Sequence, residues 1–196
     1  MAEASSNGDA RAVVLVEGVS DRAALAVLAG RRGLDLAAAG IEIVSMDGIT
    51  NIGHYLDRYC APGREVRVTG LYDDGEERFV RRGLDRIGLA GEPEELGFYA
   101  CSPDLEDELI RALGPSAVEE IVEASGELRS FRTLQRQPAQ RTRSLHDQLR
   151  RLMGGRSGNK ERYAAAMAAA VPLDRVPRPL DAVLAHVYAA LGPFRS

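Results

Sequence analysis

Carboxylate side chains in this 196-residue sequence stand just after short apolar stretches, a placement that suggests a site for divalent cations. Glu17 comes directly after the apolar run Ala12–Val16, and Asp21 lies four residues further on. Clustered carboxylates repel one another, so a shared cation would remove a cost that each would otherwise carry. Two Mg²⁺ or Mn²⁺ ions would also activate a water molecule and stabilise a leaving oxygen. The other acids of the group are Asp73, Asp74, Asp104, Glu106 and Asp107.

Each of these acids also fits an ordinary structural role when it is considered alone. Asp21 and Asp104 suit the start of a helix, where the helix dipole favours negative charge. Asp74 followed by Gly75 is typical of a turn. Asp47-Gly48 with Asn51 could line the site from the second predicted strand, but turn and cap roles are sufficient for these residues. The combination, with Glu17 directly behind a buried strand, favours the metal site.

Four short apolar runs predict the strands that would position these acids. They are Ala12–Val16, Ile41–Ser45, Val66–Tyr72 and Gly97–Cys101. Apolar residues at helical spacing follow each run and predict four helices. The first three are Val19–Gly30, with Gly30 as its C-cap, the segment from Asn51 to Cys60, and Glu76–Ile87. The fourth begins at Ser102 as N-cap, with Pro103 in its first turn.

This alternation predicts an α/β fold with a mostly parallel four-stranded sheet flanked by helices. Because ligands bind at the carboxyl ends of parallel strands, the acids are expected on one rim, and Gly18 is expected to give a sharp turn there. We expect residues 1–10 to be a disordered tail, residues 11–114 the α/β core, and residues 115–196 a helical part that completes the site.

The helical part is strongly basic, although the whole chain carries a net charge of −4. Between Glu127 and Arg162 there are ten basic and three acidic residues, a local charge of +7. This segment fits a phosphate-binding surface beside the acidic site, or a solvated helix face. The helices expected here are Ala117–Ala124, Leu128–Gln135, Ser144–Met153, Lys160–Ala170 and Leu180–Leu191.

Composition excludes several other classes of function. Nowhere in the sequence is there an apolar run of about 18 residues, so no membrane span is expected. Cys60 and Cys101 form no pair typical of a zinc site, which favours a reducing, cytoplasmic location. Aromatic residues make up only 5% of the chain and Trp is absent, which argues against a base-stacking platform for single strands.

A glycine-containing loop, Met153–Tyr163, precedes the helix that begins near Lys160. A cation is unfavourable at a helix start, and a phosphate bound there would remove the conflict. The loop fails the pattern of a nucleotide-binding P-loop because Asn159 precedes the lysine and Glu161 follows it. Lys160 is therefore a candidate phosphate-binding residue, with Arg156 and Arg162 as candidate assistants.

Several of these stretches resemble the TOPRIM domain, in particular that of the OLD (overcoming lysogenisation defect) family of nucleases. VVLVEGVSDRAALAVLA (Val13–Ala29) resembles the first TOPRIM motif, and GLYDDGEE (Gly70–Glu77) resembles the second. SPDLEDELI (Ser102–Ile110) and SGNKERYAAAMA (Ser157–Ala168) are similar to later motifs. The likeness extends from about Ala12 to Val171.

The resemblance implies a role for each matching residue. Two Mg²⁺ or Mn²⁺ ions would be held by Glu17, Asp21, Asp73, Asp104 and Glu106. Glu17 and Lys160 would also take part in catalysis directly, and Lys160 would neutralise charge at the scissile phosphate. The reaction would be hydrolysis of DNA, or of RNA. OLD-family nucleases carry an ATPase domain that this sequence lacks. We therefore expect a stand-alone domain that works with an ATPase on another chain. The domain could also form a homodimer.

Two alternative functions stay open at this point. One is another TOPRIM nucleotidyl transferase or RNA-processing nuclease. The other is a non-catalytic binding or regulatory module. Gly75 favours the second, because it stands where the usual Asp-x-Asp pattern has its second acid.

Overall fold

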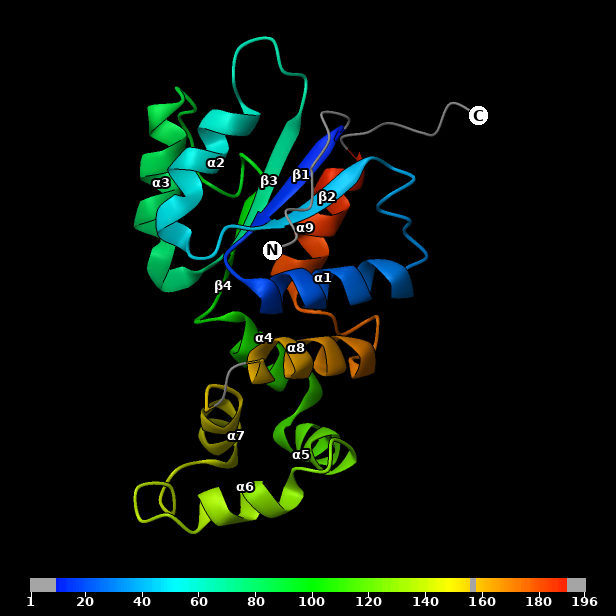
Figure 1. Ribbon diagram of the computed structural model, residues 1–196, viewed down its shortest axis with the longest axis vertical. Helices are drawn as coiled ribbons and strands as arrows, with labels where there is room; N and C mark the ends of the chain where they lie inside the picture. The colour runs from blue at the N-terminus through cyan, green and yellow to red at the C-terminus, as the bar shows by residue number, and fades with distance from the viewer. Residues whose placement is uncertain (1–9, 156–157, 190–196) are drawn as a thin grey trace, which may run out of the picture.

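The computed structural model describes residues 10–155 and 158–189, and it forms an α/β core from which a group of helices projects (Figure 1). The expected tail, residues 1–10, lies almost wholly outside the described residues. The strands are β1 (Ala12–Val16), β2 (Ile41–Ser45), β3 (Arg67–Asp73) and β4 (Phe98–Cys101). The helices are α1 (Val19–Arg31), α2 (Ile52–Tyr59), α3 (Glu77–Arg86), α4 (Leu105–Leu113), α5 (Pro115–Ala124), α6 (Leu128–Gln135), α7 (Leu145–Met153), α8 (Asn159–Ala170) and α9 (Arg178–Ala189), with short 3-10 turns at Ile49–Asn51 and Asp74–Glu76.

The four strands form one parallel sheet in the order β2-β1-β3-β4, which confirms the predicted fold class. β1 is a central strand, and all five of its residues are at most 1% exposed. Val13 and Leu15 contact the core beneath α2 and α3, whereas Ala12, Val14 and Val16 face the core beneath α1 and α9. Such two-sided burial explains the continuous apolar run of this strand.

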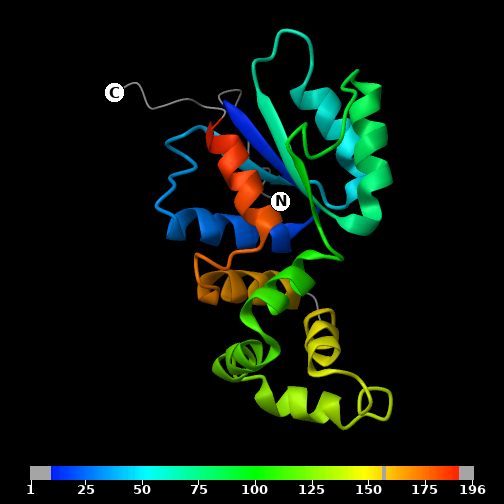
Figure 2. The ribbon, with the colours of Figure 1, turned by 180° about the vertical axis from the view of Figure 1, so that it is seen from behind.

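The helices after residue 114 divide into two groups. α5, α6 and α7 contact one another beyond α4, at the end of the molecule away from the sheet (Figures 1 and 2). α8 returns to lie along α1 and α4, and α9 covers β3 and β4. The expected domain boundary at residue 114 stays a prediction, but α8 and α9 belong spatially to the core.

Two local predictions were wrong. Gly30 is not a C-cap, because α1 continues through Arg31 and the first glycine with a positive φ is Gly33. Ser102 does not cap α4, since the helix begins at Leu105 and the Asp104 carboxylate accepts a hydrogen bond from the Asp107 N–H at 2.9 Å. Aspartate is among the strongest N-caps, so the cap lies two residues later than expected.

Candidate functional site

A pocket of about 350 Å³ lies at the carboxyl ends of the central strands and collects most of the predicted acids. Its position follows from the parallel sheet, because β1, β2 and β3 all end at the same edge. α4 and α8 close it from the side of the helical part. The lining residues are Glu17, Gly18, Val19, Ser20, Asp21, Asp47, Gly48, Asp73, Leu105, Glu106 and Lys160.

The turn from β1 into α1 holds Asp21 beside Glu17. The backbone N–H of Gly18 donates to Asp21 Oδ2 at 2.8 Å, and the N–H of Gly48 donates to the Glu17 carbonyl at 3.0 Å. The chain bends at Glu17 and Gly18, as expected, although Gly18 itself has extended backbone (φ −141°). The ends of β1 and β2 are joined by the hydrogen bond from Gly48, whose φ of +114° is one that favours glycine.

The carboxylates of the pocket raise one another's pKa values. Burial, and then the neighbouring Glu17 and Asp21 carboxylates, raises the pKa of Asp73 to about 7. Burial raises the pKa of Asp21 to about 6 against the opposing hydrogen bond from Gly18, and burial followed by repulsion from Glu76 raises the pKa of Glu17. Mutual repulsion of this kind is what a cation would relieve.

Glu106 and Lys160 come from different helices and meet at the edge of the pocket. Lys160 Nζ, on α8, lies 3.5 Å from Glu106 Oε1 on α4. Glu106 is 5% exposed, and no hydrogen-bond donor within the described residues serves its Oε1. The contact with Lys160 is therefore an ion pair without a hydrogen bond, and the oxygen keeps its capacity to bind a ligand.

Asp104 lies less centrally than predicted. Its carboxylate caps α4 and forms an ion pair with Arg150 of α7, and it lines a neighbouring pocket rather than the acidic one. Its charge still contributes to the raised pKa of Asp73. Asp107, next to it, binds Arg111 and His146 at 2.6 and 2.7 Å, so it holds α7 against α4.

The two candidate arginines have different outcomes. Arg162 forms an ion pair with Glu127 at 2.7 Å, and its guanidinium lies over the ring of Tyr163. Its contacts are thus with α6 and α8 rather than with the acidic pocket, and its phosphate-binding role stays a prediction. Arg156 lies outside the described residues.

Asp47 lines the pocket, although a turn role was sufficient to explain it in the sequence. It has a positive φ of 53°, and its Oδ1 accepts a hydrogen bond from the Ser45 hydroxyl at 3.2 Å. The signal that favours it is its register: Asp47, like Asp73 at the end of β3, lies two residues beyond the residue that pairs with Val16. Asp74, by contrast, accepts a hydrogen bond from Ser102 Oγ at 3.3 Å and is absent from the pocket lining.

The donor set of the pocket fits a hard divalent cation. All its candidate ligands are oxygens, and two of them, Glu17 Oε2 and Glu106 Oε1, are buried with no hydrogen-bond partner in the described structure. Within residues 10–155 and 158–189, however, no three His, Cys, Asp or Glu side chains are close enough to form a ready-made metal site. Side-chain rotation would be needed to bring three carboxylates onto one ion.

Comparison with known proteins agrees with this geometry. The sequence model of the family described as "Overcoming lysogenization defect protein-like, TOPRIM domain" matches residues 10–69. That segment runs from β1 into β3 and includes Glu17, Asp21 and Asp47. No curated protein was found to match the sequence.

Solved structures of OLD proteins resemble nearly the whole chain. The C-terminal region of the Burkholderia pseudomallei OLD protein superposes with a TM-score of 0.71 at 22% identity, covering 93% of this chain and 99% of that one. The C-terminal region of the Xanthomonas campestris pv. campestris OLD protein, in the structure phased with platinum, gives 0.69 at 26% identity, covering 93% and 94%. In the structure phased with mercury it gives 0.68 at 25%, covering 93% and 96%. By its fold and its strand-end acids, and by the family match over residues 10–69, this chain resembles a TOPRIM domain of the OLD-like type.

Proposed function

We propose that this protein is a metal-dependent nuclease that hydrolyses phosphodiester bonds in DNA at the acidic pocket. The observation that supports it most directly is the convergence of five carboxylates and one lysine, from five separate parts of the chain, on that pocket. Buried carboxylates cost free energy, so a protein that only needed to fold would not gain by gathering them. The OLD-like TOPRIM fold favours the same chemistry.

Glu17, Asp21, Asp47, Asp73 and Glu106 would hold Mg²⁺ or Mn²⁺ through their carboxylate oxygens. Asp104 joins this set as a more distant candidate, since Arg150 already binds it. The ions would supply Lewis-acid activation of a water molecule and of the scissile phosphate.

The residues of the chain would position and stabilise the substrate. Lys160, whose side chain is largely exposed at the pocket edge, would bind a non-bridging oxygen of the scissile phosphate. Its ammonium would offset charge that develops on the phosphate in the transition state. The hydrogen bonds from Gly18 and Gly48 would keep Asp21 and the end of β1 in place during the reaction.

A binding module without catalysis is the second candidate, and two observations favour it. Gly75 supplies no second acid after β3, and the carboxylates described here are not spaced as a ready-made metal site. RNA cleavage is a further variant of the first proposal, since the described residues that line the pocket favour neither deoxyribose nor ribose.

Plasmid nicking tests the proposal. The protein is incubated with supercoiled plasmid and Mg²⁺ or Mn²⁺, beside Glu17→Ala and the matched control Glu161→Gln, which changes an exposed acid of α8 that does not line the pocket. We expect nicking by the wild type and by Glu161→Gln, and none by Glu17→Ala or in EDTA. DNA binding without nicking under both metals would favour the binding module.

A further inference from the structure

A second pocket, of about 300 Å³, adjoins the acidic pocket. Glu106 and Lys160 line both, so the two hollows meet at the lysine that is proposed to bind the scissile phosphate. The new pocket lies between α4, α7 and the start of α8. Its lining is Asp104, Glu106, Arg143, Asp147, Arg150, Arg151, Gly154 and Lys160.

The second pocket is lined by four cationic and three acidic side chains, whereas the first has five acids and one lysine. The Asp104 carboxylate is bound by Arg150, and the Asp147 carboxylate accepts a hydrogen bond from Ser144 Oγ at 2.8 Å. The guanidinium groups of Arg143 and Arg151 form no ion pair with any residue in the described ranges, and both residues are exposed. An anionic chain that leaves the acidic pocket past Lys160 therefore meets two available cations.

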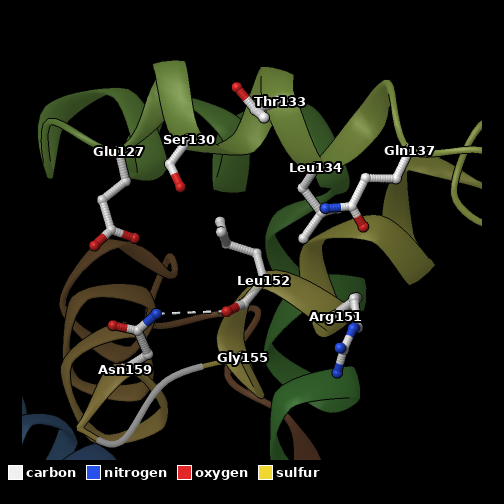
Figure 3. Close-up of a pocket in the computed structure, with 9 residues that line it drawn as sticks. All are labelled: Glu127, Ser130, Thr133, Leu134, Gln137, Arg151, Leu152, Gly155 and Asn159. Atoms are coloured by element: carbon white, nitrogen blue, oxygen red, sulfur yellow. Dashed lines mark hydrogen bonds between the residues drawn. The ribbon is translucent and has the colours of Figure 1, made fainter.

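A third pocket, of about 320 Å³, lies on the other side of Arg151, between α6, α7 and α8 (Figure 3). Glu127 lines it, and its carboxylate binds Tyr163 and Arg162. The rest of its lining apart from Arg151 is uncharged. In Figure 3 the Arg151 guanidinium points away from Glu127. A nucleic-acid backbone that contacts Arg151 would therefore run along α7 toward Arg143 and would not enter the third pocket.

We propose that the second pocket binds the DNA strand that is cut, through phosphates next to the scissile one, with Arg143 and Arg151 as their ligands. This rests on the proposed function and adds the route that the substrate takes. The pocket lining contains no aromatic side chain, so the contacts are with the sugar-phosphate backbone and independent of sequence. Ten basic residues lie between Glu127 and Arg162, and two of them, Arg143 and Arg151, thus contact the substrate outside the acidic pocket in this proposal.

The test compares two double variants with the same change in net charge. Arg143→Gln/Arg151→Gln removes the proposed phosphate ligands, and Arg129→Gln/Arg136→Gln removes two exposed arginines of α6 and its C-cap that line neither pocket. Binding of a fluorescein-labelled single-stranded 20-mer is measured by anisotropy in Ca²⁺ over a range of salt. We expect the first variant to raise Kd about tenfold and to reduce the slope of log K against log salt by about 1.4, for two phosphates on a single strand. The second should match the wild type.

Hydrolysis of bis(p-nitrophenyl) phosphate with Mn²⁺ provides the second readout, because this small diester needs only the acidic pocket. We expect the Arg143/Arg151 variant to keep wild-type hydrolysis of it while KM for the 20-mer rises. Equal weakening of 20-mer binding in both double variants, or in neither, would overturn the assignment. If no diester is hydrolysed with any metal but the binding difference persists, the proposed function fails and the binding route stands. Equal unfolding temperatures show that both variants are folded.

Discussion

The ammonium of Lys160 lies 3.5 Å from the carboxylate of Glu106, and this contact joins α8 to α4 where the acidic pocket meets the second pocket. Both residues were predicted from sequence as members of one site, and the structure brings them together. An ion pair at this position restrains a long, exposed lysine side chain in the orientation that a bound phosphate would need.

Replacing Lys160 should therefore affect chemistry more than folding. Lys160→Ala is expected to reduce kcat for plasmid nicking by about 10²-fold or more, the scale found for lost electrostatic stabilisation of a transition state. The unfolding temperature should change little because the side chain is exposed. Kinetics of nicking and a thermal melt measure the two effects. Near-wild-type kcat in the folded variant would remove Lys160 from the proposed mechanism.

Glu106 should matter for cation binding in particular. Glu106→Gln keeps the shape of a side chain that is 5% exposed and removes its charge. We expect the affinity for Mn²⁺, measured by calorimetry, to fall by about tenfold or more because a carboxylate ligand is lost. Glu120→Gln, an exposed change on α5, is the matched control. Unchanged affinity in Glu106→Gln would show that the cation binds elsewhere.

The metal-free protein should lose stability as the pH rises. Asp21 has a folded-state pKa of about 6, above its ordinary value of 3.8, so the folded state binds the extra proton between these values. Stability from this group is complete below about pH 4 and declines until the pH exceeds about 6. The full effect is about 3 kcal/mol, since the pKa rises from 3.8 to about 6 and one pKa unit corresponds to about 1.4 kcal/mol, and most of it is lost between pH 4 and pH 8.

Urea unfolding in EDTA at pH 4 and pH 8 measures this effect, with Asp21→Asn as the comparison. The asparagine can still accept the hydrogen bond from Gly18 but cannot ionise. The variant should accordingly gain stability relative to the wild type at pH 8 and not at pH 4. A gain of the same size at both pH values would mean that charge is not the cause. Saturating Mn²⁺ should reverse the order at pH 8, because only the aspartate can bind it well.

Tyr163 should stabilise the junction of α6 and α8. Its ring is fully buried, and its hydroxyl donates to Glu127 Oε2 at 2.8 Å. Tyr163→Phe is expected to lower the free energy of unfolding by about 1–3 kcal/mol, since a hydrogen bond to a charged group is lost. In the control Tyr55→Phe, the lost contact is a 3.4 Å one to the Ser45 carbonyl, so the loss should be smaller. A larger loss in Tyr55→Phe would contradict this assignment.

Patterns within one element were enough to predict much of this fold. The runs Ala12–Val16 and Ile41–Ser45 are strands with the predicted bounds, and Leu128–Gln135 is a helix with the predicted bounds. These elements could be recognised because burial on both faces, or on one helical face, leaves a direct mark on the sequence. The carboxyl-end rule then placed Glu17, Asp21 and Asp73 in one pocket.

Features that depend on contacts between distant segments could not be predicted in this way. Nothing local indicates that α9 returns to cover β3, or that Arg150 of α7 binds Asp104. Asp47 was only a secondary candidate because an aspartate followed by glycine fits a turn as well as a site, and only the sheet shows that it lines the pocket. The cap of α4 was misplaced because Ser102 and Asp104 are both good caps, and tertiary structure decides between them.

The register of the sheet restricts where this chain can change in length. Val16 of β1 pairs with Ser45 of β2 and with Leu71 of β3. Asp47 lies two residues after Ser45 and Asp73 two residues after Leu71, so the two acids flank Glu17 on either side. One residue inserted within β1 would turn its side chains to the opposite faces and carry Glu17 out of line with both acids. The loop of residues 61–66 enters β3 at the far edge of the sheet, where an insertion leaves this spacing intact. Homologous chains should accordingly vary in length there and keep a constant number of residues at the carboxyl ends.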